Sequence, residues 1–115
     1  MSFALSYAES IGANAMFIGA HSQDYSGYPD CRKEFFDAFN DMKNKGTKAG
    51  KSIKLYTPIL HMNKTQIIKY GLKLKVPYEL TWSCYKGNVK PCFKCDSCYY
   101  RIKGFESLGI KDPIL

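Results

Sequence analysis

The sequence predicts an α/β fold: part of a doubly wound, Rossmann-like parallel sheet, with a carboxy-terminal lobe built on cysteines. Two observations support this prediction. Two short apolar runs flank an amphipathic segment, and four of the five cysteines lie within the stretch CYKGNVKPCFKCDSC. Strands joined by a crossover helix lie parallel, and a parallel sheet needs several strands with helices on both faces. We therefore expect this chain to supply half of such a sheet, with residues 1–78 in the α/β part and residues 79–115 in the lobe.

The amino-terminal part of the chain predicts a helix, a strand and a second helix. Residues 2–11 place small and apolar side chains at helical spacing, and Gly12 is suited to end that helix. The apolar run of residues 15–20 (AMFIGA) predicts a strand that is buried on both faces. Residues 32–45 predict an amphipathic helix. Its apolar stripe comprises Phe35, Phe39 and Met42, with Phe36 beside it.

The middle of the chain predicts a loop, a strand and a third helix. Residues 43–51 are rich in lysine and predict a solvated loop, and residues 52–60 (SIKLYTPIL) predict the second strand. Asn63 with Gln66 forms a capping-box pattern that opens a helix extending to about Lys75.

The last predicted helix covers residues 95–108, with Gly109 as its terminator. Its spacing predicts that Tyr99, Ile102 and Phe105 face inward.

The clustered cysteines predict a metal site. Cys95 and Cys98 lie three residues apart at the start of the last helix, so their sulfurs share one face. They can then approach the roughly 3.8 Å separation of a tetrahedral site with bonds of about 2.3 Å. The four predicted ligands of one structural zinc ion are Cys84, Cys92, Cys95 and Cys98. Disulfides and an iron–sulfur cluster are alternatives, less favoured because the cysteines are odd in number and the C-x₃-C-P of ferredoxins is missing.

The charge favours an anionic ligand. Fifteen lysines and two arginines give a formal net charge of +7, which suits nucleotide phosphates, acidic small molecules or nucleic acid. A zinc-stabilised nucleic-acid-binding module is therefore an alternative, although few arginines are present for base recognition. Clustered cysteines without a signal peptide or a membrane-spanning run indicate a cytoplasmic protein with no membrane association.

Three motifs together resemble a known family. They are DYSGYPDCRKEF from Asp24 to Phe35, HMNKTQIIKYG followed by VPYELTWSCY, and KPCFKCDSCYYRIKGFESLGIKDP from Lys90 to Pro113. They are similar to the carboxy-terminal half of the 7-cyano-7-deazaguanine synthase family, within the adenine-nucleotide α-hydrolase (ATP pyrophosphatase) superfamily. The resemblance implies an ATP-dependent carbon–nitrogen ligase of queuosine biosynthesis, a tRNA modification. Such a ligase converts 7-carboxy-7-deazaguanine and ammonia into the nitrile, using ATP with Mg²⁺ and carrying one zinc ion on the four cysteines.

The sequence departs from that family at one feature. The family's amino-terminal Ser-Gly-Gly-x-Asp-Ser loop, which grips the ATP phosphates, has no counterpart in these residues. We therefore expect an amino-terminal half, on a longer chain or on a partner chain, and we expect the isolated chain to be inactive. Association into a homo-oligomer is compatible with the sequence.

Candidate substrate-binding residues follow the first predicted strand, at the sheet edge where doubly wound folds bind ligands. They are Tyr28, Asp30, Cys31 and Arg32. Asp30 is suited to accept hydrogen bonds from a guanine-like N–H edge, and Arg32 to pair with a carboxylate; the alternative for Asp30 is a helix cap. Cys31 is either a small buried group or a thiol of lowered pKa at a helix start.

Two residues of the later segments are further candidates. Lys64 stands in the first turn of the third helix, where its ammonium would meet an ATP phosphate; the alternative is an ordinary surface lysine. Trp82 is suited either to stack on a flat base or to pack in the core of the lobe.

Overall fold

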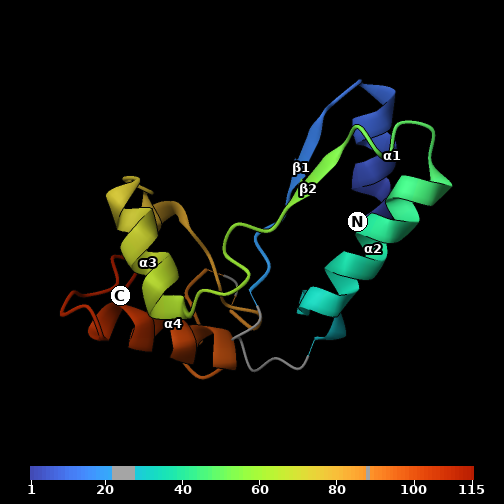
Figure 1. Cartoon of the computed structure of the whole chain (residues 1–115). Helices are drawn as coiled ribbons and strands as arrows, with labels where there is room; N and C mark the ends of the chain where they lie inside the picture. Colours follow the sequence, from blue (N-terminus) through green and yellow to red (C-terminus); the bar gives the residue numbers. More distant parts are fainter. Residues whose placement is uncertain (22–27, 88) are drawn as a thin grey trace. The chain divides into compact units, whose positions relative to one another are not determined.

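The computed structural model describes residues 1–21, 28–87 and 89–115 (Figure 1). It divides into two compact units, one formed by the described residues up to His61 and the other by Met62–Leu115. The boundary expected between residues 78 and 79 stays a prediction. The start of the motif DYSGYPDCRKEF lies outside the described residues.

The first unit is an α/β unit with a parallel pair of strands. Its elements are α1 (Ser2–Ser10), β1 (Ala15–Phe17), the 3₁₀ helix η1 (Pro29–Cys31), α2 (Lys33–Gly46) and β2 (Lys54–Tyr56). The strands pair in parallel with Met16 opposite Leu55, as predicted. Figure 1 shows α1 and α2 on the same side of this pair. The described residues form a two-stranded sheet, so the doubly wound sheet itself stays a prediction.

The core of the first unit lies between its helices and strands. Leu5 and Ala8 of α1 pack with Phe39 of α2 and with Ile53, which precedes β2. Gly12 adopts a φ of +68°, a conformation that favours glycine, and thereby ends α1 as predicted. The chain reverses there and enters β1.

The expectation that the first strand is buried on both faces is wrong. Phe17 of β1 is 72% exposed, and its ring stacks on Tyr56 of β2 with centroids 4.9 Å apart. Met16 and Leu55 face the helices and pack against the core. Among the described residues both helices of this unit lie on one side of the strand pair (Figure 1). Because side chains alternate along a strand, Phe17 and Tyr56 then face the other side from Met16 and Leu55.

The buried stripe of α2 differs from the predicted one. Its buried residues are Phe36, Phe39 and Lys43, whereas Phe35 and Met42 are exposed. Lys43 can be buried because its Nζ donates hydrogen bonds to the carbonyl oxygens of Gly50 and Ile53. The solvated loop predicted for residues 43–51 is therefore wrong at its start, where the helix continues to Gly46.

The second unit contains α3 (Lys64–Lys73), the 3₁₀ helix η2 (Tyr78–Leu80) and α4 (Asp96–Glu106). The predicted capping box at the start of α3 is confirmed. The Gln66 amide donates to Asn63 Oδ1 at 2.8 Å, and the Asn63 amide donates to Gln66 Oε1 at 2.9 Å. α3 packs against α4.

α4 is confirmed in position, but its inward face is only partly as predicted. Phe105 is 2% exposed as expected, whereas Tyr99 is 55% exposed, so the inward placement of Tyr99 is wrong. Arg101 takes an inward position and is 5% exposed. Gly109 ends the helix region with a φ of +69°. Among the described residues, every helix is too short or too polar to cross a membrane.

Replacing Lys43 with methionine tests the buried ammonium. Lys43→Met retains the packed stem but leaves the carbonyl oxygens of Gly50 and Ile53 without their donor, so we expect a loss of about 1–3 kcal/mol in the free energy of unfolding. Urea unfolding monitored by circular dichroism measures it. Lys45→Met is the control, because Lys45 forms only an exposed ion pair with Asp41. Equal losses of unfolding free energy in the two variants would contradict a stabilising role for the hydrogen bonds of Lys43.

Candidate metal centre

The structure brings the four predicted ligand cysteines together. One sulfur from each of Cys84, Cys92, Cys95 and Cys98 lies within 4.8 Å of the other three. The Cys84 and Cys95 sulfurs are 4.0 Å apart, close to the roughly 3.8 Å of a tetrahedral thiolate site. Cys84 and Cys98 are buried, and the other two are half-buried. These four residues could therefore hold one metal ion.

Local backbone structure places each sulfur. Cys95 is the N-cap residue of α4 and Cys98 stands in its first turn. The loop after Cys84 folds back over that sulfur, so that the amides of Lys86, Gly87 and Cys92 point at it from 3.4, 3.0 and 3.3 Å. Gly87 is required because a Cβ there would overlap the carbonyl oxygen of Lys90. A tight turn around one sulfur is thus encoded in the sequence between the cysteines.

The surroundings of the thiols separate their pKa values. Hydrogen bonds from backbone amides, that of Cys92 first, lower the pKa of Cys84 to about 6 against the opposing effect of burial. The Tyr85 amide is the main cause that lowers the pKa of Cys95. Burial, followed by hydrogen bonds from neighbouring thiols, raises the pKa of Cys98 to about 12. The surroundings therefore favour the thiolate form of Cys84 and Cys95 and oppose that of Cys98. A bound cation would stabilise the thiolate form of all of them.

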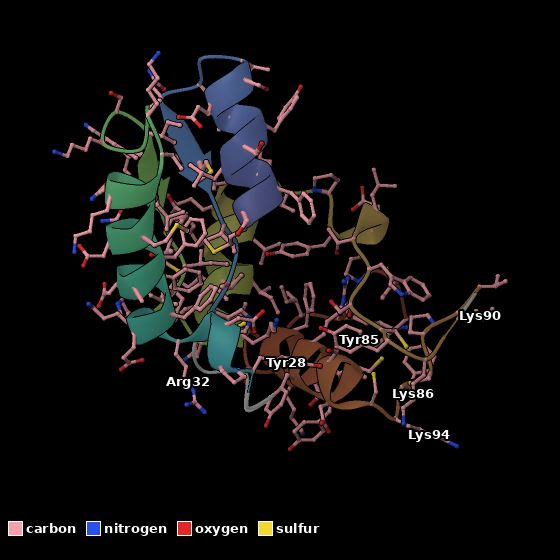
Figure 2. The ribbon with its side chains drawn as sticks, turned by 90° about the vertical axis from the view of Figure 1, so that its right-hand side faces the viewer. Tyr28, Arg32, Tyr85, Lys86, Lys90 and Lys94 are labelled. Atoms are coloured by element: carbon pink, nitrogen blue, oxygen red, sulfur yellow. The ribbon has the colours of Figure 1, made fainter. Side chains whose placement is uncertain are left out.

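The donor set fits zinc. Four sulfur donors in a compact cluster suit a soft or borderline metal ion such as Zn²⁺, and four thiolates fill a tetrahedral shell. Lys86, Lys90 and Lys94 project from the surrounding loop (Figure 2). Their charges would offset part of the −2 net charge of a Zn(Cys)₄ centre. A site of this kind holds the chain together and leaves no position open for a reacting water.

Trp82 lies beside the cluster. Its ring Nε1 donates a hydrogen bond to the carbonyl oxygen of Cys84 at 2.8 Å, and the side chain is 48% exposed. Together with Phe93 and the chain terminus at Leu115 it lines an open cavity of about 480 Å³. The indole is thus hydrogen-bonded to a candidate ligand residue and is not enclosed in a core.

The candidate substrate residues lie in the first unit, at the turn that leads into α2. Tyr28, Asp30 and Arg32 are exposed, and Cys31 is half-buried. Figure 2 shows the Tyr28 and Arg32 side chains at this turn, with Arg32 directed away from the helix. The N-cap residue of α2 is Arg32, so the alternative that Asp30 caps this helix is wrong. The turn leaves Asp30 and Arg32 accessible for binding.

Lys64, the predicted phosphate contact, is the first residue of α3 in the second unit. Its side chain is half-buried, with Cγ close to Gly104 of α4. Lys64 therefore combines a packed stem with a position at a helix amino terminus.

Sequence reasoning missed a buried ion pair in the second unit. Arg101 Nη2 donates to Asp112 Oδ1 at 2.8 Å, and both side chains are almost fully buried. A signal was present in the sequence: one of only two arginines stands three residues after Cys98, on the same helix face as this candidate ligand. Its partner in the carboxy-terminal tail gave no local signal.

Comparison with known proteins gives a consistent match. A family model described as queuosine biosynthesis protein QueC matches residues 1–109. A protein of Thermoplasma volcanium named 7-cyano-7-deazaguanine synthase is 52% identical, with the alignment covering 99% of this chain and 48% of that protein. Proteins of the same name from Chlorobium phaeobacteroides and Methanospirillum hungatei are 52% and 51% identical, with 50% and 52% of their lengths covered. The chain spans about half the length of these relatives.

Replacing Gly87 with alanine tests the turn around Cys84. The added Cβ would overlap the Lys90 carbonyl oxygen, so the loop must shift and the amide contacts to the Cys84 sulfur must lengthen. We expect metal affinity about 10–100-fold weaker, measured by chelator competition. Gly46→Ala is the control, because a Cβ there makes an ordinary 3.5 Å contact with Met42. Unchanged affinity in Gly87→Ala would contradict this account of the turn.

Proposed function

We propose a function from one premise: the chain belongs to the queuosine biosynthesis protein QueC family. The proposal is that it forms the carboxy-terminal half of an ATP-dependent 7-cyano-7-deazaguanine synthase. The observation that carries it is the similarity of 99% of the chain, at 52% identity, to a protein of that name. Because the chain spans about half of that relative, the complete activity would require the other half.

The proposed reaction has two ATP-dependent stages. The carboxylate of 7-carboxy-7-deazaguanine is first activated by adenylation, and ammonia displaces AMP to give the amide. Further ATP then drives dehydration of the amide to the nitrile. An amino-terminal half would supply the backbone amides that grip the ATP phosphates, with Mg²⁺ balancing their charge.

The turn before α2 would bind the acid substrate. Arg32 offers a planar guanidinium that matches a carboxylate, and its exposure leaves it available. Asp30 would accept hydrogen bonds from the N–H edge of the base, and the exposed ring of Tyr28 would stack on it. Cys31 is half-buried between these residues and would complete the surface. This placement follows the rule that parallel sheets bind ligands beyond the carboxyl ends of their strands.

Lys64 would contribute to binding ATP. It stands in the first turn of α3, where an ammonium and the positive end of the helix dipole both favour a phosphate.

The amino-terminal half would also complete the sheet. The face of β1 and β2 opposite the two helices carries the stacked rings of Phe17 and Tyr56. Parallel strands are normally covered on both faces, and a large exposed apolar surface marks a place where another element packs. Further strands and helices of the adenine-nucleotide α-hydrolase fold would fill this position.

The four clustered cysteines would bind one zinc ion with a structural role. A reducing cytoplasm would keep these thiols available for the metal. With its coordination shell filled by sulfur, the ion would fix the lobe and leave the chemistry to the nucleotide-binding part of the enzyme.

One observation favours a second candidate, a zinc-stabilised nucleic-acid-binding module. Lys86, Lys90 and Lys94 lie on the loop between the cysteines, and Tyr85 of the same loop is 77% exposed (Figure 2). Surfaces that bind nucleic acid commonly combine lysine side chains, which contact phosphates, with exposed aromatic rings on which bases stack.

Reconstitution tests the proposed function. The chain is co-produced with the amino-terminal half of the Thermoplasma volcanium synthase, and conversion of 7-carboxy-7-deazaguanine to the nitrile is followed with ATP and ammonia. We expect conversion only when both polypeptides are present. Arg32→Met should lower kcat/KM for the acid by about 10–100-fold, because it removes a charge-assisted hydrogen bond contributing about 1.5–3 kcal/mol.

Lys33→Met is the matched control, because Lys33 is an exposed cation that pairs with Asp37 on α2. Equal effects of the Arg32 and Lys33 variants would remove Arg32 from the substrate site. Absence of conversion in every combination, together with salt-sensitive binding of generic RNA or DNA by the chain, would favour the second candidate.

A further inference from the structure

The Arg101 guanidinium joins three segments of the second unit. Nη1 donates to both Oγ1 and the carbonyl oxygen of Thr81, at 2.7 and 3.1 Å. Nη2 donates to the Tyr78 carbonyl oxygen at 3.0 Å and to Asp112 Oδ1 at 2.8 Å. Nε donates to Asp112 Oδ2. One side chain of α4 therefore holds both the segment of residues 78–81 and the carboxy-terminal tail.

Two of the three segments that Arg101 joins, α4 and residues 78–81, carry or lead to the candidate metal ligands. Arg101 lies three residues after Cys98 on α4, and Thr81 lies three residues before Cys84. Trp82 extends the connection, since its Nε1 donates to the Cys84 carbonyl oxygen at 2.8 Å. Hydrogen bonds from the Arg101 guanidinium thus hold the backbone that precedes Cys84 against α4, the helix that carries Cys98.

Asp112 keeps the guanidinium in place. Its side chain is 1% exposed and receives two hydrogen bonds from Arg101, and its Oδ1 also accepts the amide of Ile114 at 3.3 Å. The Arg101 guanidinium carbon lies 5.6 Å from the centre of the Phe105 ring, which faces Tyr78 edge-on. A bidentate pair in this setting restricts Arg101 to one orientation.

We infer that Arg101 and Asp112 are positioning residues for the metal centre. They bring the Cys84 segment to α4 before a metal ion binds, so that the four sulfurs converge without the ion having to order that segment. Metal binding that must also order a segment is weaker by the free energy of the ordering. The inference rests on the proposed metal-binding role of the cysteines and extends the centre to a tail residue fourteen positions after Cys98.

A positioning role and a purely structural role make different predictions. If the pair positions the ligands, its loss weakens metal affinity, and by linkage a bound metal stabilises the variant less than it stabilises the original chain. If the pair only stabilises the fold, metal-free and metal-loaded forms lose the same stability and the affinity is unchanged.

The experiment compares Asp112→Asn and Thr81→Val with the original chain. Zn²⁺ affinity is measured by competition with a chromophoric chelator, and Co²⁺ loading is followed through the sulfur-to-cobalt absorption band. We expect Zn²⁺ affinity to fall about 10–100-fold in Asp112→Asn, with a smaller fall in Thr81→Val, which loses one acceptor of the guanidinium. Glu106→Gln is the control, because Glu106 forms an exposed pair with Lys103 on the same helix.

Zn²⁺ affinities equal to that of the control in both variants would overturn the inference. Should Asp112→Asn fail to fold, Thr81→Val decides the question, because it retains the ion pair. A chain that takes up neither Zn²⁺ nor Co²⁺ before any substitution would overturn the metal assignment itself. Normal metal binding by the original chain without synthase activity after reconstitution would instead count against the proposed enzyme only.

Discussion

The crowding of four cysteine sulfurs in one small volume is the constraint on which the second unit depends. Their sulfurs lie within 4.8 Å of one another, and backbone amides already favour a thiolate at Cys84. Several negative charges at such separations repel strongly in a partly buried place, so the arrangement is stable only with protons or a cation among them. The turn at Gly87, the start of α4 and the lysines of the loop all serve to bring these sulfurs together and to balance their charge.

The composition of the second unit explains why a metal ion bound by the four cysteines would contribute to its stability. Apart from cysteines, its buried large apolar side chains among the described residues are Ile68 and Phe105. A core of this size cannot offset the entropy of ordering the chain, and small units commonly gain stability from a metal or a disulfide. The Arg101–Asp112 pair supplies a second internal connection. The first unit differs, because α1, α2 and the strand pair enclose a conventional apolar core.

Residue patterns predicted the features that motifs determine. The capping box at Asn63 and the positive φ of Gly12 follow from residue type at neighbouring positions, and the parallel strand pair and the meeting of the cysteines follow from the order and spacing of motifs along the chain. Two of the failures involve polar side chains whose partners lie outside their own helix. Periodicity could not predict that Lys43 finds carbonyl acceptors beyond the end of α2, or that Arg101 finds Asp112 in the tail, because both side chains are polar and become buried only through those partners. The open strand face was also missed, because apolar composition predicts burial without naming the element that provides it.

Zinc K-edge X-ray absorption on the zinc-loaded chain tests the central claim most directly. The account predicts one zinc ion per chain with four sulfur neighbours at about 2.3 Å and an otherwise empty first shell. Nitrogen or oxygen neighbours in place of one or more sulfurs, or a chain that retains iron in preference to zinc, would contradict it.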